Sequence, residues 1–313
     1  MRVLFISSGN TRDGINIIVR NQGESLRQLG VDVDYYTIRG RGIAGYLGNV
    51  MPLIRRRRSE SYDLYHAHYS LSAFVAALAG CKPLVVSLMG SDTRAGMFRR
   101  QIIRAMNSLL WDRVIVKSES MKEGTGLTNA LVIPNGVDLD KVKPAEMGSN
   151  GGERIILFAA DPSRESKNYA LASTAGALLE EEGVTLRVLH SVSHDEVLAT
   201  LAKADVVLLT SLWEGSPNVV KEAMACNVSV VSTDVGDVRW LFGDTPGYYI
   251  TTFDACDVAG KLRRALSHGI PTSGRDRIRE LGLDSGTIAT RIKEVYDSTI
   301  TPSGHKLACG SVQ

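Results

Sequence analysis

The chain has 313 residues, of which 44% are hydrophobic and 22% charged, a balance that is typical of globular proteins and excludes a disordered chain. The net charge of +2 hides an uneven distribution, because residues 1–150 carry 20 basic and 13 acidic side chains while the rest carries 16 and 21. The length suffices for two domains of about 150 residues each, and the charge difference suggests that they have different partners.

Neither a membrane span nor a disulfide framework is expected. No run reaches the roughly 18 apolar residues that cross a bilayer, and the sequence of residues 1–8 is too short for the core of a signal peptide. Four cysteines lie far apart and form no Cys-x-x-Cys pair: Cys81, Cys226, Cys256 and Cys309. These features favour a reduced, cytoplasmic protein and give no support for a zinc site.

In the N-terminal half, apolar runs alternate with helical patterns. The run 3–7 predicts a buried strand, and the helix that follows it over 15–29 ends at Gly30. Further strands are expected at 31–38, 62–66, 84–88, 113–116 and 130–133. Further helices are expected at 43–57, 71–79 and 94–110. This alternation predicts a parallel sheet with helices on both faces.

After a Gly- and Ser-rich stretch, the alternation starts again. Strands are expected at 154–160, 185–190, 205–209 and 228–233, and helices at 168–182, 195–203, 217–225, 258–267 and 286–298. The sequence thus predicts two doubly wound α/β domains in tandem. We place the first at 1–146, a linker at 147–153, the second at 154–300 and a flexible tail at 301–313. Ligands of such sheets bind at the carboxyl ends of the strands, and a cleft between the domains is the natural active site.

The most informative segment, 211–225, follows the apolar run 206–209. Ser216 is a favourable N-cap and Pro217 is suited to the first helical position, so a helix is expected to begin at the carboxyl edge of the sheet. The free N–H groups of its first turn would form an anion site. These groups belong to Asn218, Val219 and Val220.

Two glutamates lie on either side of this helix start. Glu214 precedes the expected cap, and Glu222 lies about one and a half turns inside the helix. A carboxylate at Glu214 can accept hydrogen bonds from the hydroxyls of a neutral polyol. From the residues alone, two ordinary surface acids beside a helix start are an equally good interpretation.

The segment 211–225 resembles the donor-binding motif of the retaining glycosyltransferases of family 4 (group 1), which have the GT-B fold. The similarity continues through 227–238, and 133–138 resembles the interdomain signature of the family. Residues 65–69 and 87–92 resemble two motifs of the acceptor domain. The resemblance covers nearly all of residues 1–300 in the family's order. It implies two Rossmann-like domains facing a cleft, of which the first binds an acceptor and the second a nucleotide sugar.

The resemblance also implies roles for individual residues. Glu222 would hold the ribose of the donor, and Glu214 would contact hydroxyls of the transferred sugar. Val192 lies in the loop that would hold the nucleotide base. The groups nearest the sugar or the distal phosphate would be Ser216 and the amides of Asn218 and Val219.

A diphosphate needs cations, and the family places an arginine six residues before a lysine in the first turn of the second domain. Lys167 matches that lysine, but Asp161 occupies the position of the arginine and would repel a phosphate. Arg164 lies in the same loop and is expected to supply the missing guanidinium. The alternative for Arg164 is an ordinary solvated loop charge.

In the first domain, Gly14 follows the first strand, where the family often has a loop that touches the donor phosphates. No G-x-G-x-x-G pattern is present there, which argues against a nicotinamide or flavin enzyme. Met89 stands where many members have a histidine, so His68 or Asp92 is expected to contact the acceptor hydroxyl or the donor sugar. A structural role is an equally open interpretation for Gly14 and for the strand-end histidines His66 and His68.

The basic run Arg55, Arg56, Arg57 and Arg58 follows an apolar stretch. This pattern suits an anionic membrane surface, and also an acidic glycan or a lipid-pyrophosphate acceptor. A solvated helix end is the plainer interpretation. Nucleic acid is not an expected partner, because the chain is nearly neutral and has no nucleic-acid-binding motif.

Together these features predict a retaining glycosyltransferase that moves a sugar from a nucleoside-diphosphate sugar to a hydroxyl of a glycan or lipid-linked acceptor, in polysaccharide biosynthesis. The resemblance implies no metal cofactor. The protein is expected in the cytoplasm, with a peripheral position on the inner face of the membrane as a further option. The alternatives are a nucleotide-sugar epimerase or hydrolase of the same fold, and a binding protein without transferase activity.

Overall fold

The computed structural model describes residues 1–10, 14–90, 97–144, 153–268 and 271–301. These residues form two compact units. The first comprises Met1–Ile115, Asn129–Leu131 and the chain from Ala289 onward, and the second comprises Val116–Thr128 and Val132–Ile288. The expected linker at 147–153 and the expected tail lie almost entirely outside the described residues. The C-terminal segment from Ala289, which we expected in the second domain, belongs to the first unit.

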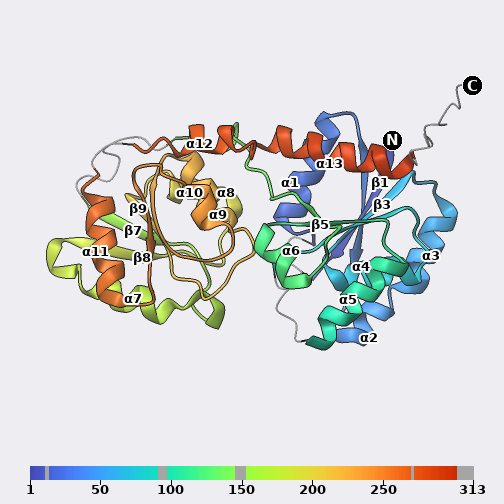
Figure 1. Ribbon diagram of the computed structural model, residues 1–313, viewed down its shortest axis with the longest axis horizontal. Helices are drawn as coiled ribbons and strands as arrows, with labels where there is room; N and C mark the ends of the chain where they lie inside the picture. Colours follow the sequence, from blue (N-terminus) through green and yellow to red (C-terminus); the bar gives the residue numbers. More distant parts are fainter. Residues whose placement is uncertain (11–13, 91–96, 145–152, 269–270, 302–313) are drawn as a thin grey trace, which may run out of the picture. The chain divides into compact units, whose positions relative to one another are not determined.

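The first sheet has six strands in the order β2-β1-β3-β4-β5-β6 (Figure 1). Its strands are β1 (Arg2–Ser8), β2 (Asp32–Ile38), β3 (Leu64–His68), β4 (Leu84–Ser87), β5 (Arg113–Val116) and β6 (Leu131–Val132). Strand β1 pairs in parallel with both β2 and β3. Its residues Val3 to Ile6 have no exposed surface, as expected for a parallel strand covered on both faces.

The helices of this part of the chain are α1 (Ile17–Gln28), α2 (Gly42–Leu47), α3 (Val50–Ser59), α4 (Ser70–Leu78), α5 (Met97–Leu109) and α6 (Glu119–Thr125). Helix α1 packs against β2, while α4 packs against β1, β3 and β4 and also contacts α2 and α3. In Figure 1, α1 lies on one side of the strands and α2, α3 and α4 lie on the other.

The second sheet has the order β11-β10-β9-β7-β8, and its strand pairs are parallel. Its strands are β7 (Arg154–Phe158), β8 (Val184–Val188), β9 (Val206–Leu209), β10 (Ser229–Thr233) and β11 (Tyr248–Thr251). The strand order reverses at β7 and β9, so the loops after these two strands diverge at the topological switch point. Open α/β sheets bind their ligands at that point.

The helices of the second unit are α7 (Tyr169–Ala177), α8 (His194–Leu201), α9 (Asn218–Ala225), α10 (Val238–Phe242), α11 (Ala255–Leu266), α12 (Gly274–Glu280) and the start of α13 (Ser285–Ile300). Short 3-10 turns occupy Glu165–Lys167 and Glu180–Glu182. Helices α7 and α11 cover one face of the sheet and α8, α9 and α10 lie on the other (Figure 1). The core beneath α7 and α11 consists of fully buried aliphatic and aromatic residues, among them Ile156, Phe158, Ala172 and Leu262.

The alternating α/β architecture that the sequence predicts is confirmed, with differences in detail. The expected helix 43–57 is two helices, because Asn49 interrupts it. The Asn49 side-chain amide donates to the carbonyl oxygens of Arg39 (2.8 Å) and Gly45 (2.7 Å), and so closes the loop around α2. Strand β11 and the helices α6, α10 and α12 were not predicted.

Among the described residues, no helix combines the length and the apolar character needed to cross a bilayer.

Candidate functional site

At the switch point of the second sheet, a lysine and a glutamate from two different loops form an ion pair. Lys167 Nζ, in the turn after β7, lies 2.5 Å from Glu214 Oε1, in the loop after β9. Ser211 Oγ donates to the same oxygen at 2.7 Å. The side chains of Lys167 and Glu214 are only 15% and 17% exposed, so solvent screens their attraction less than on an open surface. The structure thus brings together two residues that the sequence placed in the donor site.

Hydrogen bonds hold the turn after β7 and the loop after β9 together. Thr210 Oγ1 donates to the carbonyl oxygens of Lys167 and Asn168, both at 3.0 Å, and the amide of Leu212 donates to the carbonyl of Ser166 at 2.9 Å. Gly236 has a positive φ of 61° and approaches the loop so closely that a Cβ would lie 2.7 Å from the carbonyl oxygen of Gly215. Glycine is therefore required at Gly236. Hydrogen bonds and close backbone packing therefore support the two loops that carry the ion pair.

Helix α9 begins one residue later than predicted. Its N-cap is Pro217 and its first residue is Asn218, and no side chain caps it. Ser216 is therefore not the cap, because its hydroxyl instead accepts a hydrogen bond from Lys221 Nζ at 3.1 Å. The helix nevertheless begins at the carboxyl edge of the sheet, where the amide groups of its first turn, including those of Asn218 and Val219, favour an anion.

Lys221 is a buried cation that the sequence reasoning missed. Its side chain has no exposed surface, and Nζ also donates to the carbonyl oxygen of Asn135 at 2.8 Å. The Asn135 amide in turn donates to Asn218 Oδ1 at 3.3 Å. Burial lowers the pKa of Lys221 to about 8, against the opposing attraction of Asp237. Lys221 thus connects the 133–138 segment to the loop before α9.

A second buried lysine lies near the first. Lys117 follows β5 and is 3% exposed, and burial together with the charge of Lys221 lowers its pKa to about 7. In the sequence, each of these lysines is a charged residue among apolar neighbours. Lys117 follows the apolar run of β5, and Lys221 lies among the buried residues of α9. Such a signal indicates a buried charge but does not identify its partners.

Glu222, the predicted ribose ligand, also has a partner that the sequence did not indicate. His194 Nε2 lies 2.9 Å from Glu222 Oε1. This hydrogen bond raises the pKa of His194 above its ordinary value, while partial burial opposes the shift. Val192 lies in the loop before α8, just after the positive-φ residue Ser191, and is half-buried.

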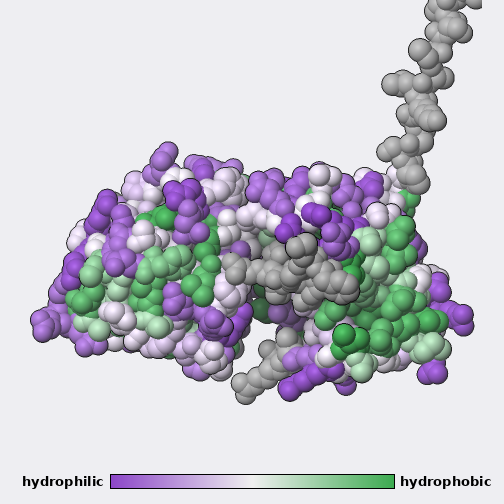
Figure 2. Space-filling model, turned by 60° about the horizontal axis from the view of Figure 1, so that its bottom comes forward, coloured by the Kyte–Doolittle hydropathy of each residue, from purple (hydrophilic) through white to green (hydrophobic). Residues whose placement is uncertain are grey.

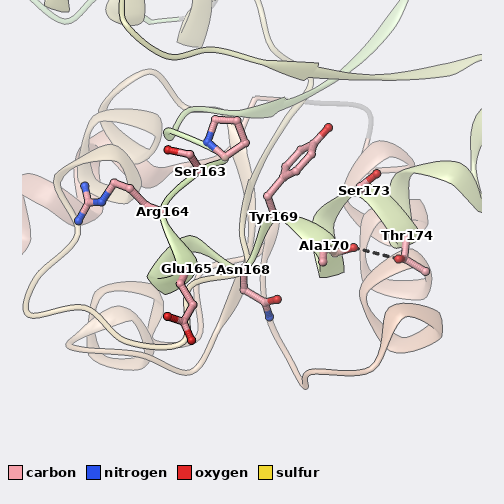
Figure 3. Close-up of a pocket in the computed structure, with 9 residues that line it drawn as sticks. Ser163, Arg164, Glu165, Asn168, Tyr169, Ala170, Ser173 and Thr174 are labelled. Carbon is pink, nitrogen blue, oxygen red and sulfur yellow. Dashed lines mark hydrogen bonds between the residues drawn. The ribbon is translucent and has the colours of Figure 1, made fainter.

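Asp161 and Arg164 both lie in the turn after β7, but they have different contacts. Asp161 Oδ1 accepts hydrogen bonds from the backbone amide and the hydroxyl of Ser163, at 2.9 and 2.7 Å, and these bonds lower the pKa of Asp161. The carboxylate thus shapes the turn. Arg164 is exposed and lines a cavity of about 570 Å³ that also involves Tyr169 and Thr174 (Figure 3). In Figure 3, the guanidinium of Arg164 points away from Tyr169.

In the first unit, the strand-end histidines are buried. His66 has no exposed surface, and its ring nitrogens lie 2.5 Å from the Tyr296 hydroxyl and 2.9 Å from Ser87 Oγ. With both nitrogens engaged, His66 is a structural residue. His68 is 3% exposed and stacks on His66 at a centroid distance of 4.2 Å, with Phe5 also in contact.

Two further candidates of the first unit, Gly14 and Met89, follow the strands β1 and β4. Gly14 has a positive φ of 75° with open space where a side chain would be, as a tight turn requires. Met89 is half-buried. Asp92 lies outside the described residues. Within the described residues, no group of three or more His, Cys, Asp or Glu side chains is placed to hold a metal ion.

Two family models match the chain. The model for glycosyltransferase family 4 matches residues 12–141, and the model for glycosyl transferases group 1 matches residues 156–268. TuaC of Bacillus subtilis (strain 168), a glycosyltransferase named for teichuronic acid biosynthesis, is 26% identical over 58% of this chain and 55% of its own length. D-inositol 3-phosphate glycosyltransferase of Corynebacterium jeikeium is 24% identical over 81% of this chain and 83% of its own.

Solved structures share the fold over nearly the whole chain. Sucrose-phosphate synthase from Thermosynechococcus elongatus superposes with a TM-score of 0.77 at 17% identity, covering 95% of this chain and 98% of that one. Anabaena HepE in complex with UDP-glucose gives 0.73 at 17% identity, covering 95% and 100%. The expected GT-B fold is confirmed.

Proposed function

The chain belongs to the group 1 glycosyltransferases of family 4, and from this membership we propose that it transfers a sugar from a nucleoside-diphosphate sugar to a hydroxyl group of an acceptor, retaining the anomeric configuration. The observation that carries the proposal is the ion pair of Lys167 and Glu214 at the switch point of the second sheet, beside the start of α9. This arrangement offers a cation and free amides to a diphosphate, and a carboxylate to sugar hydroxyls.

In the proposed reaction, the bond between the sugar's anomeric carbon and the diphosphate breaks, and a bond from that carbon to the acceptor oxygen forms. The acceptor's proton goes to the leaving diphosphate, so a histidine at the position of Met89 is not needed. Lys167 and the first-turn amides of α9 stabilise the developing negative charge. Glu214 orients the sugar, Glu222 holds the ribose, and His68 and Asp92 remain candidates for contact with the acceptor.

The donor and acceptor classes are proposed from the relatives. HepE was solved with UDP-glucose, and starch synthase IV of Arabidopsis thaliana with ADP, so a uridine or adenosine diphosphate sugar is the first donor to test. TuaC takes its name from teichuronic acid biosynthesis, which supports a surface polysaccharide or its lipid-linked precursor as the acceptor. We propose that no bound metal takes part.

Release of the nucleoside diphosphate from UDP-glucose, ADP-glucose and GDP-mannose, measured with and without lipid-linked and polysaccharide acceptors, tests this function. We expect release that an acceptor accelerates at least about tenfold and that EDTA leaves unchanged. Equal release without an acceptor would instead indicate a hydrolase. Tight binding without turnover would indicate a binding protein, and isomerised donor would indicate an epimerase.

We also propose that the first unit docks on an anionic membrane surface. Helix α2 has no buried residue, and exposed apolar side chains gather on it and on the start of α3: Ile43 is 74% exposed, Leu47 49% and Met51 59%. In Figure 2, a broad hydrophobic area lies over the part of the first unit that carries α2. An exposed apolar patch of this kind marks an interaction surface.

The four arginines of the basic run 55–58 lie in two different environments. The charge of Arg56 is compensated by Glu60, which lies 2.8 Å away, and Arg57 is half-buried near Gly80. Arg55 and Arg58 are exposed, as are Arg39 and Arg41 on the other side of α2. Apolar side chains between exposed arginines suit the interface of an anionic bilayer.

Flotation with lipid vesicles tests this surface. We expect binding to vesicles that contain phosphatidylglycerol and not to vesicles of phosphatidylcholine alone, and weaker binding at high salt. Since each basic residue near the surface contributes about 1 kcal/mol, Arg55→Ser combined with Arg58→Ser should weaken binding by more than about tenfold. The control pair Arg263→Ser and Arg279→Ser, which lies in α11 and α12, should bind as the unchanged protein does. Equal binding to both kinds of vesicle would contradict the proposal.

A further inference from the structure

His194 and Glu222 connect two helices at the proposed ribose site. His194 is the first residue of α8, and the hydroxyl of the preceding residue Ser193 caps that helix by accepting from the amide of Glu196. The cap fixes the start of α8, and α8 packs against α9, which carries Glu222. The ring nitrogen Nε2 and the carboxylate oxygen Oε1 are 2.9 Å apart, and the two side chains are 24% and 15% exposed.

Three charged groups act on the His194 ring. Glu222 from α9 and Asp195 from its own helix favour the protonated ring, while Lys141, from the segment after 133–138, opposes it. The hydrogen bond to Glu222 is the largest influence, and the net result is a pKa above the ordinary value of about 6.5. His194 therefore keeps its proton to a higher pH than an ordinary histidine, and it does so while in contact with the carboxylate.

The charge on His194 matters because of what Glu222 would bind. A nucleotide sugar carries two negative charges on its diphosphate, and an uncompensated carboxylate at Glu222 disfavours that ligand. A protonated His194 cancels the carboxylate charge, and its hydrogen bond to one oxygen leaves the other oxygen to accept from ribose hydroxyls. A neutral ring can still donate a hydrogen bond but supplies no compensating charge.

We propose that His194 is a positioning residue for Glu222, and that its protonation increases the affinity of the protein for its nucleotide sugar. The inference rests on the proposed function, since it takes Glu222 as the ribose ligand. It adds a regulatory property, namely donor binding that weakens as the pH rises. By thermodynamic linkage, binding of the donor must then draw a proton onto the protein in the pH range in which His194 titrates.

Calorimetric titration with the strongest binder among UDP-glucose, ADP-glucose and GDP-mannose tests the inference between pH 5.5 and 8.5. The diphosphate diester of these probes does not titrate in this range. For the unchanged protein we expect the dissociation constant to rise about three- to tenfold across the range, a size typical of one partly screened charge pair. Titrations across this range in buffers of different ionisation enthalpy should show net proton uptake on binding where the dissociation constant changes with pH.

Two variants of His194 distinguish the effect of its positive charge from the effect of its hydrogen bond to Glu222. His194→Arg keeps a permanent cation beside Glu222, so its dissociation constant should stay low at every pH. His194→Gln keeps a neutral donor, so its dissociation constant should stay at the high-pH value with no proton uptake. His268→Gln, a histidine beyond α11, serves as the matched control and should keep the profile of the unchanged protein. Melting temperatures at each pH verify that all variants are folded.

The outcomes distinguish this inference from the function on which it rests. If none of the three donors binds, the proposed nucleotide-sugar site itself is wrong. If a donor binds and His194→Gln retains the pH profile and the proton uptake of the unchanged protein, the role of His194 is overturned while the site stands. A His194→Arg variant with a profile as steep as that of the unchanged protein would overturn it equally.

Discussion

Replacing Lys167 with alanine is expected to weaken binding of the nucleotide sugar by at least about tenfold, because the change removes a phosphate ligand and also leaves a carboxylate unpaired. In the folded protein, Lys167 Nζ lies 2.5 Å from Glu214 Oε1, and both side chains are largely buried. Without the ammonium group, Glu214 would face an anionic ligand, and the partner that remains to it among the described residues is the neutral Ser211 hydroxyl. The lost attraction and the new repulsion act in the same direction.

Arg164→Ala provides the matched comparison, since both side chains come from the turn after β7. Arg164 is exposed, and solvent-exposed charges contribute little. We expect its loss to weaken donor binding by less than about threefold. Calorimetry with the best donor measures both changes. An equal loss in the two variants would make Arg164 a phosphate ligand of the same rank, and unchanged affinity in both would remove this turn from the site.

Combining the lysine change with Glu214→Gln separates its two effects. If the unpaired carboxylate of Glu214 causes part of the loss, then Lys167→Ala in the Glu214→Gln background should cost less affinity than Lys167→Ala alone. The coupling between the two residues is then measurable as the difference. If the losses simply add, the ion pair has no part in donor binding, whatever the individual effects. Melting temperatures exclude unfolding as the cause.

The sequence predicted the architecture because buried parallel strands are continuous apolar runs. The runs that became β1, β5 and β9 are buried apart from residues at the strand ends, and their predicted positions agree with the structure to within a residue or two. The elements that were missed are short or lie at an edge. Strand β11 is an edge strand with two half-buried residues, and α10 has only five residues, so neither shows a clear period.

The candidate site was predictable only where sheet topology decides it. Lys167 and Glu214 follow two strands that are neighbours in the sheet, so the pattern of strands already implied that their loops would be close. The contacts of Lys221 with Asn135 and of His194 with Glu222 join residues 86 and 28 positions apart, and no periodicity encodes them. His194 showed no motif in the sequence, and its significance depends entirely on the packing of α8 on α9.

The second large effect concerns stability. Lys117→Met is expected to stabilise the fold at pH 6 by an amount on the order of a few kcal/mol, because it replaces a buried cation with an apolar side chain of similar length. Lys117 is 3% exposed, and its pKa falls to about 7 through burial and the nearby charge of Lys221. The unfolded chain binds the proton up to about pH 10.4, so between these values the unfolded state holds more protons than the folded state.

The sign of the pH dependence follows from this difference. Below pH 7 the folded protein bears the full cost of a buried charge, and as the pH rises towards 10 the cost disappears because Lys117 becomes neutral in the fold. The gain from Lys117→Met should therefore be largest at pH 6 and much smaller at pH 9. Urea unfolding at pH 6, 7.5 and 9 measures it, with the exposed Lys143→Met as the control that should show no such trend. A gain of the same size at every pH would mean that Lys117 keeps its proton in the folded protein up to pH 9 and that burial does not lower its pKa. A loss of stability would mean that its ammonium has a compensating partner.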